Sequence, residues 1–314
     1  MNITTFLIFA RTIVGCAIIV AQPTNPPYSA FARQLQSSKP ELRTFTAEFL
    51  QRNGEISSSA FNDDRGVVIF PVFVNGREVW ALLDTGTGAT LIDTRLAREL
   101  GLQTVRMGTP ARTRTGTLER SKIVGVELLI PGQFRFPADF NGVDLSGVSK
   151  ALDKEIGVVI GRDILNAVSF YVDTAAKRIV FLPSKAMKFQ EGQITRLTLK
   201  DGLLQGTING IAANMEIDLG ANGQLDIPQT KWDRYIQGDL ELGINRNVDA
   251  IGEARTDIYA SNVELRLGSI IVQTRTSRVP ELRDGIDAYV GYGFFNGRKV
   301  MFDYAASEVL VLRQ

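Results

Sequence analysis

Two short segments of the chain each carry a carboxylate at the end of an apolar run. Asp84-Thr85-Gly86 follows residues 79–83, and a weaker copy, Asp218-Leu219-Gly220, follows a run that contains Met215 and Ile217. Two carboxylates within hydrogen-bonding distance cannot both ionise comfortably, so such a pair holds one proton between them over a wide acidic range. The sequence therefore predicts that Asp84 and Asp218 form one proton-sharing pair.

The composition narrows the chemistry that the chain can perform. It contains no histidine, and its single cysteine, Cys16, lies near the N-terminus. A Ser-His-Asp triad, a Cys-His pair and a histidine-ligated zinc site are therefore excluded. Carboxylate, lysine and tyrosine side chains remain for acid–base work. We predict neither a metal nor a cofactor.

Charge and length limit the partners and the number of domains. The net charge is +1, with 35 basic and 34 acidic residues, so the composition favours neither a nucleic acid nor an anionic membrane as partner. The 314 residues, 44% of them hydrophobic, can bury one large core or two domain-sized cores.

The surroundings of the two aspartates also repeat, and this favours two domains. Asn75-Gly76 lies nine residues before Asp84, and Asn209-Gly210 lies nine before Asp218, so both pairs share one offset in the numbering. Val159-Ile160-Gly161 and Tyr289-Val290-Gly291 repeat at nearly the same offset, each followed at the same spacings by an asparagine and an aspartate. A duplicated unit therefore accounts for almost everything after residue 60.

Within each copy the pattern is that of short strands and turns. Residues 66–74 are apolar and β-branched up to Asn75-Gly76, and residues 77–83 lead back to Asp84. Asn-Gly between two such runs is the strongest short-range signal for a β-hairpin. Helical pattern is confined to short pieces such as residues 94–100 and 229–236. The predicted class is all-β, with lobes at residues 61–187 and 188–314.

Over residues 62–314 the chain resembles the aspartic proteases of the pepsin and retropepsin type. In that family each lobe, or each subunit of a dimer, supplies one Asp-Thr/Ser-Gly loop and an apolar-apolar-Gly segment that packs beneath it. The lobes here are short, like retropepsin subunits, yet fused in one chain, as in pepsin. The resemblance implies two tandem acid-protease β-barrel lobes. It also implies an endopeptidase for peptide or protein substrates, with Asp84 and Asp218 as its catalytic dyad.

The resemblance assigns roles to residues around the dyad. Gly86 and Gly220 would leave room for the facing loop and carboxylate. Val159, Ile160 and Val290 would wall the site, and Gly161 and Gly291 would allow close packing below it. A hairpin over the substrate should follow each aspartate, and the candidates for its tip are Gly116 and Gly252, at a similar distance after Asp84 and Asp218.

Leu219 is the main departure from the family pattern, which has threonine or serine there. In the family this hydroxyl bonds across to the opposite loop and fixes the two carboxylates, so Thr85 lacks its mirror partner. Three hypotheses stay open: an endopeptidase with one intramolecular dyad that needs no oligomer, a peptide-binding protein that has lost turnover, and a homodimer that uses two first lobes.

The N-terminal segment has the pattern of an export signal. An apolar stretch ends at Ala21 and is followed by polar, proline-rich residues. We predict cleavage after residue 21 and a periplasmic or secreted protein. An uncleaved anchor, or lipidation at Cys16, would instead tie it to a membrane. Residues 22–60 are predicted to be a linker or N-terminal extension with a short helix over residues 41–51.

Overall fold

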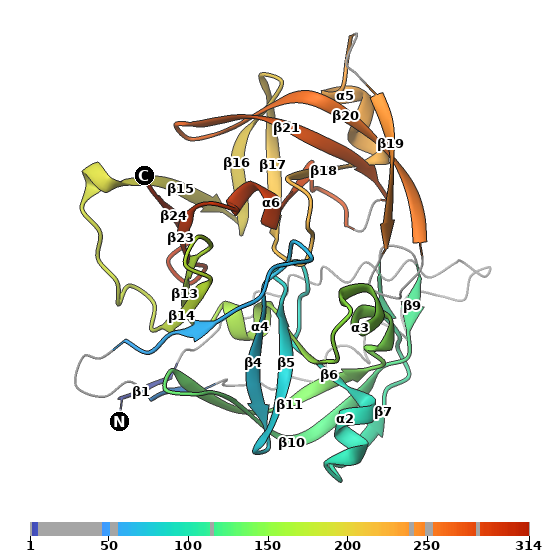
Figure 1. Ribbon diagram of the computed structural model, residues 1–314, viewed down its shortest axis with the longest axis vertical. Helices are drawn as coiled ribbons and strands as arrows, with labels where there is room; N and C mark the ends of the chain where they lie inside the picture. Colours follow the sequence, from blue (N-terminus) through green and yellow to red (C-terminus); the bar gives the residue numbers. More distant parts are fainter. Residues whose placement is uncertain are drawn as a thin grey trace, which may run out of the picture.

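The computed structural model describes residues 2–5, 46–50, 56–113, 116–238, 242–248, 254–280 and 283–313. Two β-barrels dominate these residues, the first at the bottom and the second at the top of Figure 1. The predicted all-β class with two tandem barrel lobes is therefore confirmed. Most of the predicted export signal, residues 1–21, and most of the predicted extension, residues 22–60, lie outside the described residues.

Each barrel is a closed ring of six strands with the same pairing order. The first ring consists of β4 (Ile69–Val74), β5 (Arg77–Leu83), β12 (Ile156–Ile160), β6 (Leu91–Asp93), β11 (Phe134–Val143) and β10 (Ser121–Ile130), which returns to β4. The second consists of β16 (Leu203–Ile208), β17 (Ile211–Asp218), β22 (Ala288–Gly291), β18 (Leu225–Pro228), β21 (Ile270–Val279) and β20 (Ala254–Leu267), which returns to β16.

The pairing directions also match between the two barrels. β5 runs parallel to β12 as β17 does to β22, and β6 runs parallel to β11 as β18 does to β21. One irregularity also corresponds, because β10 and β20 each shift register once against the next strand. The repeat in the sequence is therefore a repeat of the whole barrel.

The two predicted Asn-Gly hairpins are present. Asn75 and Gly76 have φ values of 48° and 83°, and Asn209 and Gly210 have values of 49° and 77°. Two successive positive φ angles are what a two-residue hairpin turn requires, and Asn-Gly adopts them at least cost. Each asparagine side chain also accepts a 2.9 Å bond from a neighbouring strand, at Glu127 N and Glu264 N. The turns thus fix the register of β5 and β17.

A sheet shared by both halves of the chain joins the barrels, on the left of Figure 1. Its strands in order are β3 (Ser59–Ala60), β14 (Arg178–Leu182), β13 (Ser169–Asp173), β23 (Lys299–Asp303), β24 (Glu308–Leu312) and β15 (Ile194–Lys200). β13 pairs with β23 so that Tyr171 lies opposite Met301, its own equivalent in the repeat that relates Gly161 to Gly291. An approximate two-fold axis therefore passes through this sheet.

The core is continuous across the shared sheet. Phe170 is fully buried; it stacks on Phe302 at 4.8 Å between ring centroids and contacts Phe181 at 6.0 Å. Because Phe170 belongs to the first copy and Phe302 to the second, the apolar contact that stabilises one barrel also holds the other.

The remaining elements are short and lie around the barrels. The strands are β1 (Asn2–Thr5), β2 (Thr46–Phe49), β7 (Thr104–Arg106), β8 (Ala111–Arg112), β9 (Thr117–Leu118) and β19 (Leu242–Val248). The helices are α2 (Thr94–Glu99), α3 (Ser146–Leu152), α4 (Arg162–Leu165), α5 (Trp232–Tyr235) and α6 (Tyr292–Phe295), with 3-10 turns η1 (Glu191–Gln193) and η2 (Gln229–Lys231).

Four of these elements test the predicted helices. The pieces at residues 94–100 and 229–236 are helical, as α2 and as η2 with α5. The helix predicted over residues 41–51 is wrong for residues 46–49, which form β2 and pair with β11. Alternation of buried Ala47 and Phe49 with less buried neighbours suits a sheet edge, and this tertiary pairing overrides local helix propensity. No helix in the described ranges is long and apolar enough to span a bilayer.

The shared core predicts that the two lobes unfold together. Phe170→Ala should lower the free energy of unfolding by about 3–5 kcal/mol, because a large buried ring is lost at the junction. Urea denaturation followed by fluorescence should show one transition at a lower midpoint. Val105→Ala, at a side chain that is 46% exposed, should change the free energy by less than about 0.5 kcal/mol. Two separate transitions, only one of them moved, would show that the lobes are independent.

Candidate active site

The two hairpins bring Asp84 and Asp218 to equivalent places. Asp84 directly follows β5, and its backbone N–H donates to Ile160 O of β12 at 3.1 Å. Asp218 ends β17, opposite Gly291 of β22 in the parallel pairing. In each lobe a central parallel strand therefore fixes the backbone of the aspartate.

The two aspartate loops meet across the boundary between the lobes. A Cβ atom on Gly86 would lie 2.6 Å from Asp218 Oδ1, and a Cβ atom on Gly220 would lie 2.6 Å from Asp84 Cγ. Any side chain at either glycine would collide with the opposite carboxylate. The structure thus brings the predicted residues Asp84, Asp218, Gly86 and Gly220 together, and glycine is required at both positions by space.

Thr85 makes the polar contact between these loops. Its buried hydroxyl donates to Ile217 O at 2.8 Å and accepts from Leu219 N at 2.9 Å. Both partners lie in the second lobe. A single hydroxyl therefore ties the first loop to the strand and loop that carry Asp218.

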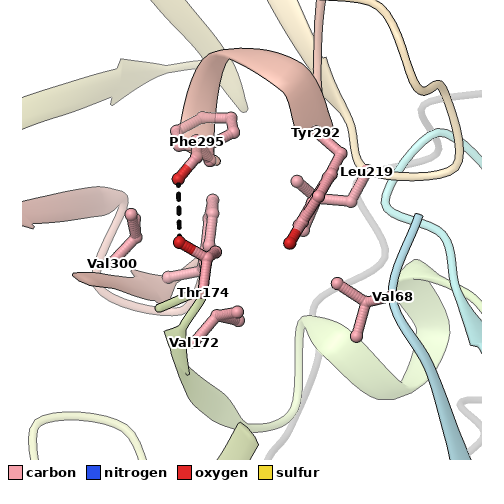
Figure 2. A pocket seen from close by; sticks show the side chains of 8 residues that line it. Val68, Val172, Thr174, Leu219, Tyr292, Phe295 and Val300 are labelled. Atoms are coloured by element: carbon pink, nitrogen blue, oxygen red, sulfur yellow. Dashed lines mark hydrogen bonds between the residues drawn. The ribbon is translucent and has the colours of Figure 1, made fainter. Parts of the chain in front are cut away.

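Leu219 supplies no such bond, and its side chain packs into an apolar pocket instead (Figure 2). The pocket has no room for a water molecule. Its lining includes Val68 of the first lobe, Val172 and Val300 of the shared sheet, and Tyr292 of α6. The second loop is thus held by packing where the first is held by hydrogen bonds.

The apolar-Gly segments lie on β12 and β22 and just after β12, beside the strands that lead to the aspartates. Val159 and Ile160 of β12 and Val290 of β22 are buried in the barrel cores. A Cβ atom on Gly161 would lie 2.5 Å from Ala89 C, and one on Gly291 would lie 2.3 Å from Gly223 O. The backbone of each segment therefore presses directly against the aspartate loop of its own lobe.

Thr87 and Thr90 are site residues that the sequence analysis missed. Thr87 Oγ1 donates to Asp84 Oδ2 at 2.6 Å, and the N–H groups of Gly86 and Thr87 donate to Asp84 Oδ1 at 2.8 and 3.0 Å. Thr90 donates to Asp163 of α4 and accepts from Gly161 N. The signal was local, because a hydroxyl three residues after a loop aspartate is well placed to bond to it.

Burial raises the pKa of Asp84 to about 6 from its ordinary value of 3.8, and the negative charge of Asp218 acts in the same direction. The hydrogen bonds from Thr87 and Gly86 oppose this shift because they favour the ionised form. Asp84 therefore keeps a proton at pH values where an exposed aspartate has lost it.

Of the two candidate hairpin tips, Gly116 lies among the described residues. Gly116 lies in the connection between β8 and β9, where its N–H donates to Thr113 Oγ1 at 3.0 Å and its carbonyl accepts from Thr113 N at 2.9 Å. Gly252 lies outside the described residues, between the paired strands β19 and β20. The role of both as covers of the site stays a prediction.

Three charged residues near Asp84 and Asp218 were not found from the sequence. Glu216 of β17 forms ion pairs with Arg162 of the first lobe and Arg283 of the second, and Arg283 also donates to Gly86 O at 2.5 Å. No signal marked them, because their contacts join segments far apart in the chain. Within the described residues there is no group of three or more acidic, histidine or cysteine side chains that could hold a metal ion.

The hydroxyl of Thr85 should contribute to the stability of the fold. Thr85→Val keeps the shape but leaves Ile217 O and Leu219 N buried without their partner, so the free energy of unfolding should fall by about 2–4 kcal/mol. Thr85→Ser keeps the hydroxyl and should cost about 1 kcal/mol. Urea denaturation measures both variants. Equal losses in the two would show that the cross-lobe bonds contribute nothing.

The raised pKa of Asp84 gives a stability effect with a definite sign. The unfolded chain releases this proton near pH 3.8 and the folded chain near pH 6, so ionisation in the folded state destabilises it above this range. Asp84→Asn should therefore raise the free energy of unfolding by about 2–3 kcal/mol at pH 7. The gain should shrink as the pH falls from about 6 to about 4. A gain independent of pH in denaturation experiments would contradict this assignment.

Comparison with known proteins agrees with this fold. Residues 70–164 match a family described as aspartyl protease, a stretch that spans the first aspartate loop, its apolar-Gly segment and most of the first barrel. A search of curated proteins gives no match. The match and the two closed barrels together confirm that the chain resembles the retropepsin-like aspartyl proteases, in a two-lobe form within one chain.

Proposed function

We propose that this protein is an exported aspartic endopeptidase whose single active site lies between the lobes, with Asp84 and Asp218 as the catalytic dyad. The observation that carries the proposal is the mutual approach of the two loops, in which Gly86 adjoins the carboxylate of Asp218 and Gly220 adjoins that of Asp84. In this proposal, residues 61–187 and 188–314 are the two lobes. It also keeps residues 1–21 as the export signal.

The dyad would act by moving two protons. The ionised member takes a proton from a water molecule as the water oxygen attacks the peptide carbonyl, and the protonated member donates to the carbonyl oxygen. The raised pKa of Asp84 makes it the better candidate for the protonated member below about pH 6. Because the two carboxyl groups titrate together, the observed pKa values belong to the pair.

Leu219 supports one rival function, a protein that binds peptides without cleaving them. Its side chain lines an apolar pocket and has no hydroxyl, whereas the family has a hydroxyl here, opposite Thr85. A displacement of the dyad by about 1 Å can cost ~100-fold in rate. The contacts of Thr85 with Ile217 and Leu219 in the same chain favour either of these functions over a homodimer of first lobes.

Export and the state of the N-terminus remain part of the proposal. The protein would be periplasmic or secreted after cleavage behind residue 21. An uncleaved segment, or a lipid on Cys16, would place the same site at a membrane surface. Mass spectrometry of the mature N-terminus distinguishes these forms.

The two aspartates should both be essential for cleavage. Residues 22–314 should digest an unfolded protein between about pH 3 and 7. The rate should fall as the pH rises through about 6, where Asp84 loses its proton. Asp84→Asn and Asp218→Asn should each abolish cleavage, as followed by gel and mass spectrometry.

Three other outcomes would overturn the proposal. Cleavage that survives only Asp218→Asn, and falls on dilution, would mean that two first lobes pair. Tight peptide binding without turnover would establish the binding function. Cleavage that survives both substitutions would mean that the dyad is not the active site.

A further inference from the structure

A buried carboxylate that the proposed mechanism does not use lies two residues before Asp218. The side chain of Glu216 is 1% exposed, and its Oε1 atom lies 2.6 Å from Arg162 Nη2 and 3.0 Å from Arg283 Nη1. Its other oxygen, Oε2, is buried and has no hydrogen-bond partner among the described residues. Such a group costs stability, so its presence calls for another explanation.

The contacts of this cluster cross between the lobes twice. Arg162 begins α4, directly after Gly161 in the first lobe, and pairs with Glu216 of the second lobe. Arg283, of the second lobe, donates to the carbonyl of Gly86 in the first aspartate loop at 2.5 Å. The chain of contacts from Gly86 through Arg283 and Glu216 to Arg162 thus starts and ends in the first lobe and passes beside Asp218.

The duplication shows what this cluster replaces. When Asp84 is aligned with Asp218, Thr85 corresponds to Leu219, and Leu82 corresponds to Glu216. The first copy is therefore apolar two residues before its aspartate and polar one residue after it, and the second copy has the reverse order. At these two positions, each copy has one polar side chain that contacts the opposite lobe.

We propose that Glu216, held by Arg162 and Arg283, is a positioning residue that fixes the Asp84 loop against the second lobe and takes over the task of the hydroxyl missing at Leu219. The inference rests on the proposed function, because it assigns a role relative to the dyad. It adds three residues to that site. Glu216 is the buried carboxylate, Arg283 bonds to Glu216 and to Gly86 O, and Arg162 joins Glu216 to the first lobe.

The charges of this cluster and of the two aspartates also act on one another. Burial raises the pKa of Glu216, while Arg162 and Arg283 oppose the shift and the charges of Asp218 and Asp84 add to it. The other groups that face this space are Thr87, which bonds to Asp84, and Tyr304, whose pKa burial raises so that it stays neutral. Removing one arginine should therefore raise the pKa of Asp84, and removing the charge of Glu216 should lower it.

The first test is kinetic and uses a fluorogenic peptide that the wild-type protein cleaves. Arg283→Gln should lower kcat by roughly 10- to 100-fold, with KM changed less than about threefold, because only positioning is lost. Arg283→Lys keeps the charge but not the forked contact, so it should fall between wild type and Arg283→Gln. Arg95→Gln, which breaks the exposed pair with Glu155, is the matched control and should leave kcat unchanged.

Rescue distinguishes positioning from a general structural effect. In a Leu219→Thr background, where the second hydroxyl is restored, Arg283→Gln should cost less than about threefold in kcat. Equal losses in both backgrounds would overturn the inference. So would a loss of kcat that follows only the fall in thermal stability across the variants.

The second test needs no turnover, so it separates this inference from the proposed function. The carboxyl carbon of Asp84, labelled with ¹³C and assigned by its loss in Asp84→Asn, should titrate near pH 6 in the full chain. Its midpoint should rise in Arg283→Gln and fall in Glu216→Gln. Midpoints that do not move would overturn the role of the cluster. If the wild-type protein is inactive but the midpoint moves in the two variants, only the proposed function is contradicted.

Discussion

The rest of the structure depends on one constraint, that two half-buried carboxylates from different halves of the chain lie beside one another. Burial and mutual repulsion raise the free energy of the doubly ionised pair, which is why the pKa of Asp84 rises to about 6. Loops that could move apart would relieve this repulsion. The loops are therefore packed without side chains at Gly86 and Gly220, and each rests on a glycine backbone of its own barrel. The shared sheet, with Tyr171 opposite Met301, contains the approximate two-fold axis that relates the two aspartate loops.

Duplication supplies the symmetry, but the two loops are held by different forces. The hydroxyl of Thr85 bonds to Ile217 O and Leu219 N of the other lobe, whereas the side chain of Leu219 lines an apolar pocket with Val68, Val172 and Val300. Burial of a leucine contributes about 1.5–3 kcal/mol, and a neutral hydrogen bond contributes about 1 kcal/mol. The exchange can therefore preserve stability. A methyl group has little directional preference, however, and the direction of the loop must be set by something else.

The sequence predicts the barrels better than it predicts the site. Asn75-Gly76 and Asn209-Gly210 dictate hairpins locally, and their constant distance to Asp84 and Asp218 reveals the repeat. β13 and β23 are equivalent strands of the two copies, and they pair with each other. The repeat makes them equivalent, but no local signal in the sequence indicates that two edge strands pair. Arg283 and Gly86 are 197 residues apart, and the residues around each of them give no signal of the hydrogen bond between them. Glu216 is a charged residue inside a strand, two residues before Asp218, and by itself it weakens a strand prediction instead of marking a site.

A buried ion pair is a weak source of stability, because desolvation offsets most of the attraction between its members. Its geometry is well defined, since a guanidinium must align its N–H groups with both acceptors. Arg283 bonds to Glu216 and to Gly86 O at once, so it constrains the loop in a direction that packing at Leu219 leaves free. The second copy thus gives up a short, neutral contact beside its aspartate and gains a longer, charged one that acts on the opposite loop. The charges of Asp218 and Asp84 also raise the pKa of Glu216, so the proposed positioning of the Asp84 loop and the charge beside the two aspartates depend on one cluster.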